Sequence, residues 1–288
     1  AIVSSHALPA GWNVIALLDA VASLQPHAHA LIDTGALVTG MSNREVAAYL
    51  LPRLPESVEG AVYLERGGHK KILLRGSTTA MDLERCGLPK ERRFSFFDQV
   101  HTTGMDIPQG ASARAVLTLG KDLTFRDYAQ GAYRMRGIGK GQTIVLFVIP
   151  EVHRLCASEV ALGAGCTTDA LAARRASMPQ LERQRAELEG VASWLVINSM
   201  KSERVQFELW CMHCAQNVWR KRALRQLLMS HASFADARDG KGASESERRA
   251  LEVFRERLER DVSNSVPTST DTRQAIAMAA QLHGELLQ

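Results

Sequence analysis

The sequence predicts an α/β domain built on a mostly parallel sheet with flanking helices, followed by an all-α region. Three observations lead to this fold class. Short apolar runs alternate with helical patterns from about residue 30 to 149, and most of these runs are rich in Val, Ile, Leu or Phe, as buried strands are. Strand signals then disappear after Pro150.

Six apolar runs are the predicted strands. They lie at 29–33, 61–65, 71–75, 94–98, 113–119 and 143–149. Gly67 and Gly68 separate the second run from the third, which indicates a β-hairpin over 61–75. Ser42 followed by Glu45 has the spacing of a capping box, so a helix is expected to start there.

The chain is expected to divide into a helical lead-in at 1–26, the sheet domain at 27–150 and a helical domain at 151–288. Amphipathic patterns predict helices near 177–189, 191–200, 203–231, 244–261 and 271–287. Polar stretches at 235–246 and 263–271 are the predicted linkers.

Composition indicates a globular protein of ordinary kind. Hydrophobic residues make up 45% and charged residues 23% of the chain. The formal net charge of +4 is compatible with a nucleic-acid partner but does not by itself indicate one.

The apolar run at 143–150 is too short to span a membrane. Five cysteines, an odd number, suit a reducing intracellular compartment, cytoplasmic or nuclear. The start lacks a Met and a signal-peptide pattern, so we expect an internal piece of a longer protein.

Two segments carry the clearest functional pattern. In 98–108 a strand ends at Asp98 and runs into a loop of the form Thr-Thr-Gly-Met-Asp-Ile-Pro. In 126–143 a predicted helix with Gln130 and Arg134 breaks at Gly137 before the next strand. One apolar strand lies between the two segments.

This arrangement resembles motifs V and VI of superfamily 2 helicases, which lie in the second RecA-like lobe. Gln130 and Arg134 keep the family spacing. Arg136, however, lies one residue short of the second family arginine, whose place is taken by Gly137. The resemblance implies a RecA-like domain that acts with an upstream lobe of the parent chain, which would share ATP and Mg²⁺ with it.

The resemblance also implies roles for individual residues. An arginine finger stabilises the charge that develops on the γ-phosphate during transfer, because a guanidinium stays charged and donates to several phosphate oxygens. The catalytic candidates are Arg134, which keeps the family spacing and is the preferred finger, and Arg136. The nucleotide-binding candidates are Gln130, Gly104 and Asp106, and the nucleic-acid contacts are Thr102, Thr103 and Thr34. The alternative without a function is that both arginines are solvated helix residues and that 101–108 is an ordinary turn.

A wider resemblance covers most of 27–150. Residues 29–50, 96–109 and 117–142 are similar to a set of very large eukaryotic proteins that are often described as ubiquitinyl hydrolases. A thiol-dependent hydrolase with ubiquitin as a partner is therefore the second hypothesis. The third is a degenerate RecA-like scaffold without activity.

Other motifs compete with this interpretation. Asp98 to His101 matches a D-E-x-H box only in part, because Gln99 stands where the catalytic Glu would be. Residues 137–143 contain a Lys among glycines but lack the P-loop spacing. Asp33-Thr34-Gly35 matches an aspartic-protease triplet, without a second copy.

The last candidates lie in the helical region. Cys211, His213 and Cys214 lack further ligands at a zinc-site spacing, so core cysteines are favoured, although none of the five is excluded as a nucleophile. The basic run at 219–226 is most simply a solvated helix face. If it binds a polynucleotide, Trp219 is a candidate stacking residue.

Overall fold

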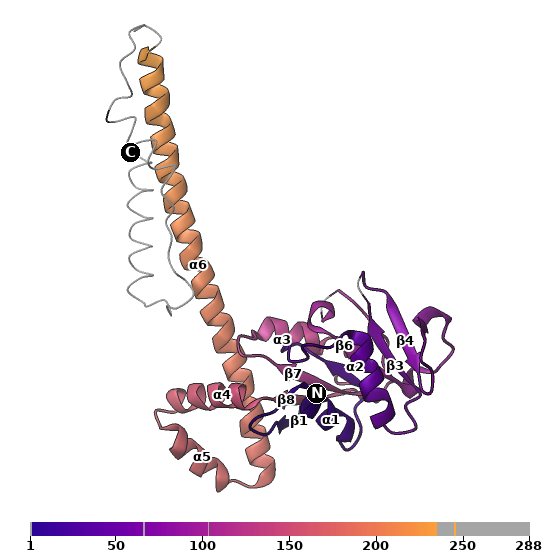
Figure 1. Ribbon diagram of the computed structural model, residues 1–288. Helices are drawn as coiled ribbons and strands as arrows, with labels where there is room; N and C mark the ends of the chain where they lie inside the picture. The colour runs from indigo at the N-terminus through magenta and orange to yellow at the C-terminus, as the bar shows by residue number, and fades with distance from the viewer. Residues whose placement is uncertain (1, 66, 103, 235–244, 246–288) are drawn as a thin grey trace. The chain divides into compact units, whose positions relative to one another are not determined.

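The computed structural model describes residues 2–65, 67–102, 104–234 and 245 (Figure 1). The chain divides into two compact units, Ala1–Ser199 and Met200–Gln288, which are described separately. The first unit contains a mixed, mostly parallel sheet, so the α/β class predicted from the sequence is correct.

The sheet has eight strands in the order β1-β8-β7-β2-β6-β3-β4-β5. The strands are β1 (Ile2–Ala7), β2 (Ala30–Ile32), β3 (Gly60–Leu64), β4 (Lys70–Leu74), β5 (Ala80–Asp82), β6 (Arg93–Phe97), β7 (Arg114–Leu119) and β8 (Thr143–Val148). Neighbours from β1 to β3 run parallel, whereas β3–β4 and β4–β5 are antiparallel. All six predicted strands and the predicted hairpin are therefore present.

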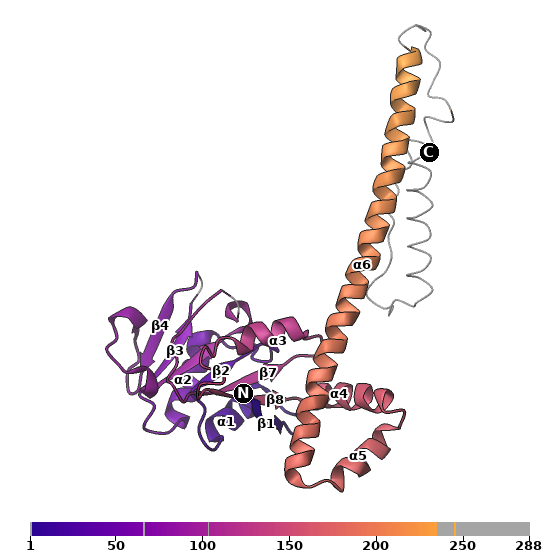
Figure 2. The ribbon, with the colours of Figure 1, turned by 180° about the vertical axis from the view of Figure 1, so that it is seen from behind.

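Helices lie on both faces of the sheet. The helices of the described chain are α1 (Val14–Ser23), α2 (Asn43–Leu50), α3 (Phe125–Ala132), α4 (Pro150–Gly163), α5 (Thr168–Ala176) and α6 (Gln180–Phe234), and α6 continues into the second unit. α1 packs against α2. α3 lies on the side of the sheet opposite to α1, which is visible from the front and from behind (Figures 1 and 2). Right-handed crossovers explain this. The chain moves across the sheet in one direction through α1 and α2 and in the opposite direction through α3, and a right-handed connection that reverses its direction lies on the other face of the sheet.

Two of the short helices begin with capping boxes. The side chain of Ser42 accepts from the amide of Glu45 at the start of α2, as predicted, and Thr124 and Asp127 form the equivalent box at the start of α3. Both helices follow the carboxyl end of a parallel strand. The caps therefore fix where each loop at this edge of the sheet ends.

Residues 150–199 belong to the same core as the sheet. Val152, Val191, Trp194 and Leu195 are buried with the strand residues in one cluster. The hydroxyl of Ser5 in β1 donates to a carboxylate oxygen of Glu187 in α6 at 3.0 Å. We expected a domain boundary at 150, but the compact unit extends to Ser199, because these helices bury apolar side chains against the sheet.

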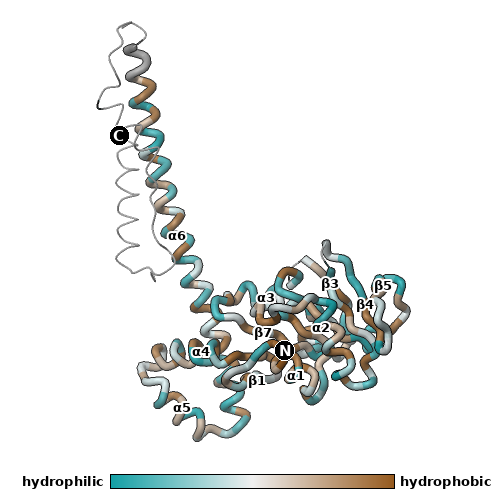
Figure 3. The backbone as a smooth tube through the Cα atoms, in the orientation of Figure 1, coloured by the Kyte–Doolittle hydropathy of each residue, from teal (hydrophilic) through white to brown (hydrophobic). Residues whose placement is uncertain are grey.

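The second unit is described as far as Phe234, together with Glu245. α6 continues in it, and its hydrophobic and hydrophilic residues alternate along its length (Figure 3). Cys211, Ala215 and Val218 are buried on one face, whereas Phe207 and Trp210 are exposed.

Several sequence-based expectations need correction. Residues 1–26 are not only helical, because 2–7 form the edge strand β1. The polar residues Ser4, Ser5 and His6 interrupt the apolar pattern by which a strand is recognised in the sequence. The helices expected at 177–189, 191–200 and 203–231 are one continuous helix, since Gly190 packs closely against Val160 and Arg175 without interrupting it. β5, α4 and α5 were not predicted. The expected helices at 244–261 and 271–287 and the two linkers lie outside the described residues, apart from Glu245.

Candidate functional site at the carboxyl edge of the sheet

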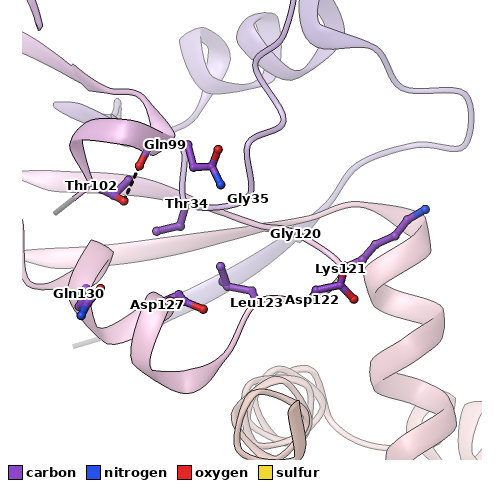
Figure 4. Close-up of a pocket in the computed structure, with 10 residues that line it drawn as sticks. All are labelled: Thr34, Gly35, Gln99, Thr102, Gly120, Lys121, Asp122, Leu123, Asp127 and Gln130. Carbon is purple, nitrogen blue, oxygen red and sulfur yellow. Dashed lines mark hydrogen bonds between the residues drawn. The ribbon is translucent and has the colours of Figure 1, made fainter. Parts of the chain in front are cut away.

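A cavity of about 460 Å³ lies beyond the carboxyl ends of three neighbouring parallel strands, β7, β2 and β6 (Figure 4). We call it the carboxyl-edge cavity. It is lined by Thr34, Gly35, Gln99, Thr102, Gly120, Lys121, Asp122, Leu123, Asp127 and Gln130. Ligands of open parallel sheets bind at this edge, where the chain changes direction across the sheet.

Thr34 and Thr118 join the loop after β2 to strand β7. The hydroxyl of Thr34 donates to the carbonyl oxygen of Thr118 at 2.7 Å, and the amide of Gly35 donates to the Thr118 hydroxyl at 3.0 Å. That hydroxyl in turn donates to Asp33 Oδ1 at 2.6 Å. The hydrogen of the Thr34 hydroxyl is therefore already used, and only its oxygen can contact a ligand, as an acceptor.

Asp33 is a structural acceptor. Its carboxylate also accepts from the amides of Leu37 at 3.0 Å and Val38 at 2.9 Å. Burial raises the pKa of Asp33, and the nearby charge of Asp98 raises it further, whereas the hydrogen bonds from Thr118, Val38 and Leu37 oppose the rise. This carboxylate closes the turn after β2, so it is already occupied, which opposes the aspartic-protease interpretation of Asp33-Thr34-Gly35.

Three glycines allow the walls of the cavity to approach closely. A Cβ on Gly35 would lie 2.7 Å from the backbone nitrogen of Gly120, and one on Gly120 would lie 2.8 Å from the carbonyl oxygen of Gly35. A Cβ on Gly131 in α3 would lie 2.2 Å from Cγ2 of Thr34. Gly120 and the loop that follows it were not predicted as part of a site. A glycine directly after a buried strand was the signal that could have found them.

Three of the predicted residues meet in this cavity. Thr34 follows β2, Thr102 follows β6, and Gln130 lies on α3, although they are far apart in the sequence. The Thr102 side chain is buried and its hydroxyl donates to the carbonyl oxygen of Gln99 at 2.8 Å, whereas Gln130 is exposed. Lys121 adds one positive charge to the lining, whereas Asp122 and Asp127 add two negative charges.

Arg134 does not line the carboxyl-edge cavity. Its side chain is folded inward, only 8% of the residue is exposed, and Nη1 donates to the carbonyl oxygen of Met105. Burial lowers the pKa of Arg134 and the charge of Arg136 lowers it further, while Asp106 opposes this. Arg134 therefore ties the loop at 104–108 to the segment after α3.

Arg136 is presented toward solvent. Its side chain is 47% exposed, Nε lies 3.6 Å from Oδ2 of Asp106, and its guanidinium carbon lies 4.4 Å from the centre of the Tyr133 ring. Gly104 has a φ of +76°, which turns the loop before Asp106. The structure thus brings Arg134, Arg136, Gly104 and Asp106 together as a second group. Thr103 lies outside the described residues.

The glycine-rich segment at 137–143 is a closed turn before β8. The amide of Gly137 donates to Oε1 of Gln142 at 2.7 Å, and Nε2 of Gln142 donates to the carbonyl oxygen of Gly110 at 2.8 Å. A P-loop joins a strand to a helix, whereas this segment leads into a strand. The geometry agrees with the view that it is not a phosphate cradle.

Two of the five cysteines are poorly suited to act as nucleophiles. Burial raises the pKa of Cys156 to about 12, and burial also raises the pKa of Cys211, so both are protonated at neutral pH. Within the described part of the chain, no cluster of three or more His, Cys, Asp and Glu side chains could hold a metal ion. None of the helices in that part is long and apolar enough to cross a membrane.

Comparisons with protein-family models, with curated proteins and with solved structures found no match for this chain. Its function is therefore inferred from the two groups of residues at the carboxyl edge of the sheet.

Proposed function

We propose that the sheet unit is the second, RecA-like lobe of a helicase-like, nucleotide-dependent motor. The observation that carries this proposal is the convergence of Thr34, Thr102 and Gln130 on one cavity at the carboxyl edge of the sheet. These residues come from three segments to which the helicase resemblance assigns ligand contacts, and a ligand site at this edge is what such a lobe requires.

In this proposal Arg136 is the arginine finger. A finger has to leave its own lobe and reach a γ-phosphate held by another, so it needs an exposed guanidinium. Arg136 has one, with Asp106 and Tyr133 beside it. Arg134 is nearly buried on the carbonyl of Met105, so its role is to position the loop at 104–108.

ATP would lie between this unit and an upstream lobe of the parent chain. Gln130 and Lys121 offer polar contacts to its outer side, whereas the phosphate cradle and the Mg²⁺ ligands would belong to the upstream lobe. A single-stranded polynucleotide would cross the carboxyl edge, where Thr102, Thr34 and Lys121 lie.

The test is nucleic-acid-stimulated ATPase activity of the longer chain that contains the upstream lobe. Arg136→Ala is expected to lower kcat at least about a hundredfold, because a finger supplies charge stabilisation only in the transition state. Arg126→Ala, on the exposed side of α3, is the matched control and should leave kcat unchanged.

Arg134→Ala tests the role of Arg134 in positioning the loop separately from the role of Arg136 as the finger. It should lower the unfolding temperature of the isolated 288-residue chain, which Arg136→Ala should not. Full ATPase activity in Arg136→Ala would exclude it as the finger. Absence of any activity in the unsubstituted longer chain would favour the scaffold hypothesis.

A further inference from the structure

Four large apolar side chains are exposed along one side of α6 within the second unit. Met200 and Trp210 are each 62% exposed, Leu224 is 50% exposed and Phe207 is 41% exposed. The covered side of the same helix, which carries the buried Ala215, is a different one. Large apolar side chains that gather on one exposed face indicate a surface that binds another molecule.

The spacing of these residues is that of a coiled-coil seam. Steps of three and four residues alternate through positions 200, 203, 207, 210, 214, 217, 221 and 224 of α6. We call these eight positions the heptad row. Its other members are the exposed Glu203, Asn217 and Lys221 and the half-buried Cys214. The row is about 36 Å long at 1.5 Å of rise per residue.

The heptad row carries one acid near its start and one base near its end. Glu203 and Lys221 are separated by 18 residues of the same helix, or about 27 Å, so they cannot pair within one chain. Arg204, beside the row, already lies 3.4 Å from a carboxylate oxygen of Glu208. The row therefore presents both signs of charge, one at each end.

This charge order favours a second helix of the same sequence that runs in the opposite direction. Two parallel copies in register would place Glu203 against Glu203 and Lys221 against Lys221, and both contacts are repulsive. Two antiparallel copies place Glu203 of each chain opposite Lys221 of the other. A partner of one charge sign would match only one end of the row.

The apolar residues match in the same antiparallel register. When a two-fold axis passes beside position 212, each residue before it faces the residue that lies equally far after it. The facing pairs are Met200 with Leu224, Glu203 with Lys221, Phe207 with Asn217, and Trp210 with Cys214. Each pair occurs twice, as an isologous two-fold interface requires.

We propose that the heptad row of α6 pairs with the heptad row of a second copy of this chain, in an antiparallel dimer. The two copies bury the exposed Met200, Trp210 and Leu224 in apolar layers on both sides of the axis. The Glu203–Lys221 contacts fix the direction and the register, as flanking and seam charges do in coiled coils. The proposal goes beyond the motor function and does not depend on it.

The first measurement is the mass of the 288-residue chain in solution, by sedimentation equilibrium at micromolar concentrations. We expect twice the mass of one chain. Glu203→Lys should raise the dissociation constant of the dimer at least about tenfold, because it creates two like-charge contacts across the axis. Lys221→Glu should do the same.

Two combinations of these variants test the antiparallel register. The double variant Glu203→Lys/Lys221→Glu should regain the dimer, because the attractive pairs are restored with their signs exchanged. An equimolar mixture of the two single variants should form heterodimers, in which both pairs are attractive. Glu182→Lys is the matched control: Glu182 is an exposed acid of the same helix outside the row, so its reversal should leave the dimer intact.

The contrary outcomes are equally definite. A single-chain mass at every concentration would overturn the proposal and mean that another part of the chain or a different molecule covers the row. A dimer that persists in both single variants would use another surface, and failure of the double variant to dimerise would exclude this register. Circular dichroism and urea unfolding check that each variant is folded.

Discussion

At the scale of single residues, the carboxyl edge is held together by a buried acid and by glycines. Asp33 accepts three hydrogen bonds there, yet burial still raises its pKa. The network is therefore a compromise in which hydrogen bonds only partly offset the loss of hydration. This compromise makes the stability of the unit depend on pH in a defined direction.

The first prediction concerns that pH dependence. A carboxyl whose pKa is raised in the folded state binds its proton more tightly there, so its contribution to stability is present below the ordinary carboxyl pKa and is lost as the pH rises through the raised value. In Asp33→Asn this titration is absent. The difference in unfolding free energy between the unsubstituted chain and Asp33→Asn should therefore decrease from about pH 4 upward, as measured by urea unfolding. If the unfolding free energies of the two proteins changed in parallel with pH, this prediction would be wrong.

The second prediction concerns Gly131. A Cβ at this position would lie 2.2 Å from Cγ2 of Thr34, so Gly131→Ala must displace either α3 or the loop after β2. We expect a loss of about 1–3 kcal/mol in unfolding free energy, which is typical of overpacking, and urea unfolding measures it. Gly163→Ala is the control, because that glycine also lies in a helix but a Cβ there would meet no neighbouring atom of the described chain within 4 Å. Equal stability of the two variants would show that the close contact relaxes freely.

At the scale of elements, short helices at the carboxyl edge depend on their caps. α3 has only 8 residues, and Thr124 and Asp127 satisfy each other's backbone amides at its start. A helix of this length is not stable in isolation, so its cap and its packing determine where Asp127 and Gln130 lie.

The third prediction follows from this dependence. Thr124→Ala should lower the unfolding free energy by about 0.5–2 kcal/mol, as the loss of an N-cap does, and the effect is measured by thermal or urea unfolding. Thr168→Ala is a suitable comparison, because Thr168 is the first residue of α5 and the cap there is Thr167. If both substitutions had the same effect, the capping interaction would not be its cause.

Elements were predictable from the sequence where the pattern was local. The capping box at Ser42, the Gly67–Gly68 hairpin and the six apolar strands each depend on neighbouring residues, and all are present. β1 was missed because it is polar and becomes a strand only by pairing with β8, which lies far away in the sequence. The continuity of α6 was missed because Gly190 usually marks a break, whereas here it serves close packing.

The candidate site was predictable in part. Thr34, Thr102 and Gln130 were chosen from motif resemblance, and they line one cavity. The sequence could not place Arg134 inward and Arg136 outward, because that difference depends on the path of the chain after α3 ends.

At the scale of the whole molecule, the sheet requires the helices that follow it. Val152, Val191, Trp194 and Leu195 are buried in the same core as the strands, so a chain that stops before them would expose an apolar face.

The fourth prediction tests this requirement with two fragments. Residues 1–199 should fold and unfold in one cooperative transition, followed by the fluorescence of the buried Trp194 and by circular dichroism. Residues 1–149 should aggregate or unfold without cooperativity. A stable, cooperative 1–149 fragment would mean that the boundary expected at 150 is correct after all.

The turn at 99–101 separates the carboxyl-edge cavity from a second cavity of about 600 Å³, whose lining includes Asp98, Val100 and His101, and this has a thermodynamic consequence. A ligand that shifted this wall from one side would alter the shape of the space on the other, so the affinities of the two cavities for their ligands would be linked. Linkage is reciprocal: whatever factor the first occupant applies to the affinity for the second, the second applies to the affinity for the first. A turn of three residues would then couple what binds on one of its sides to how tightly a ligand is held on the other.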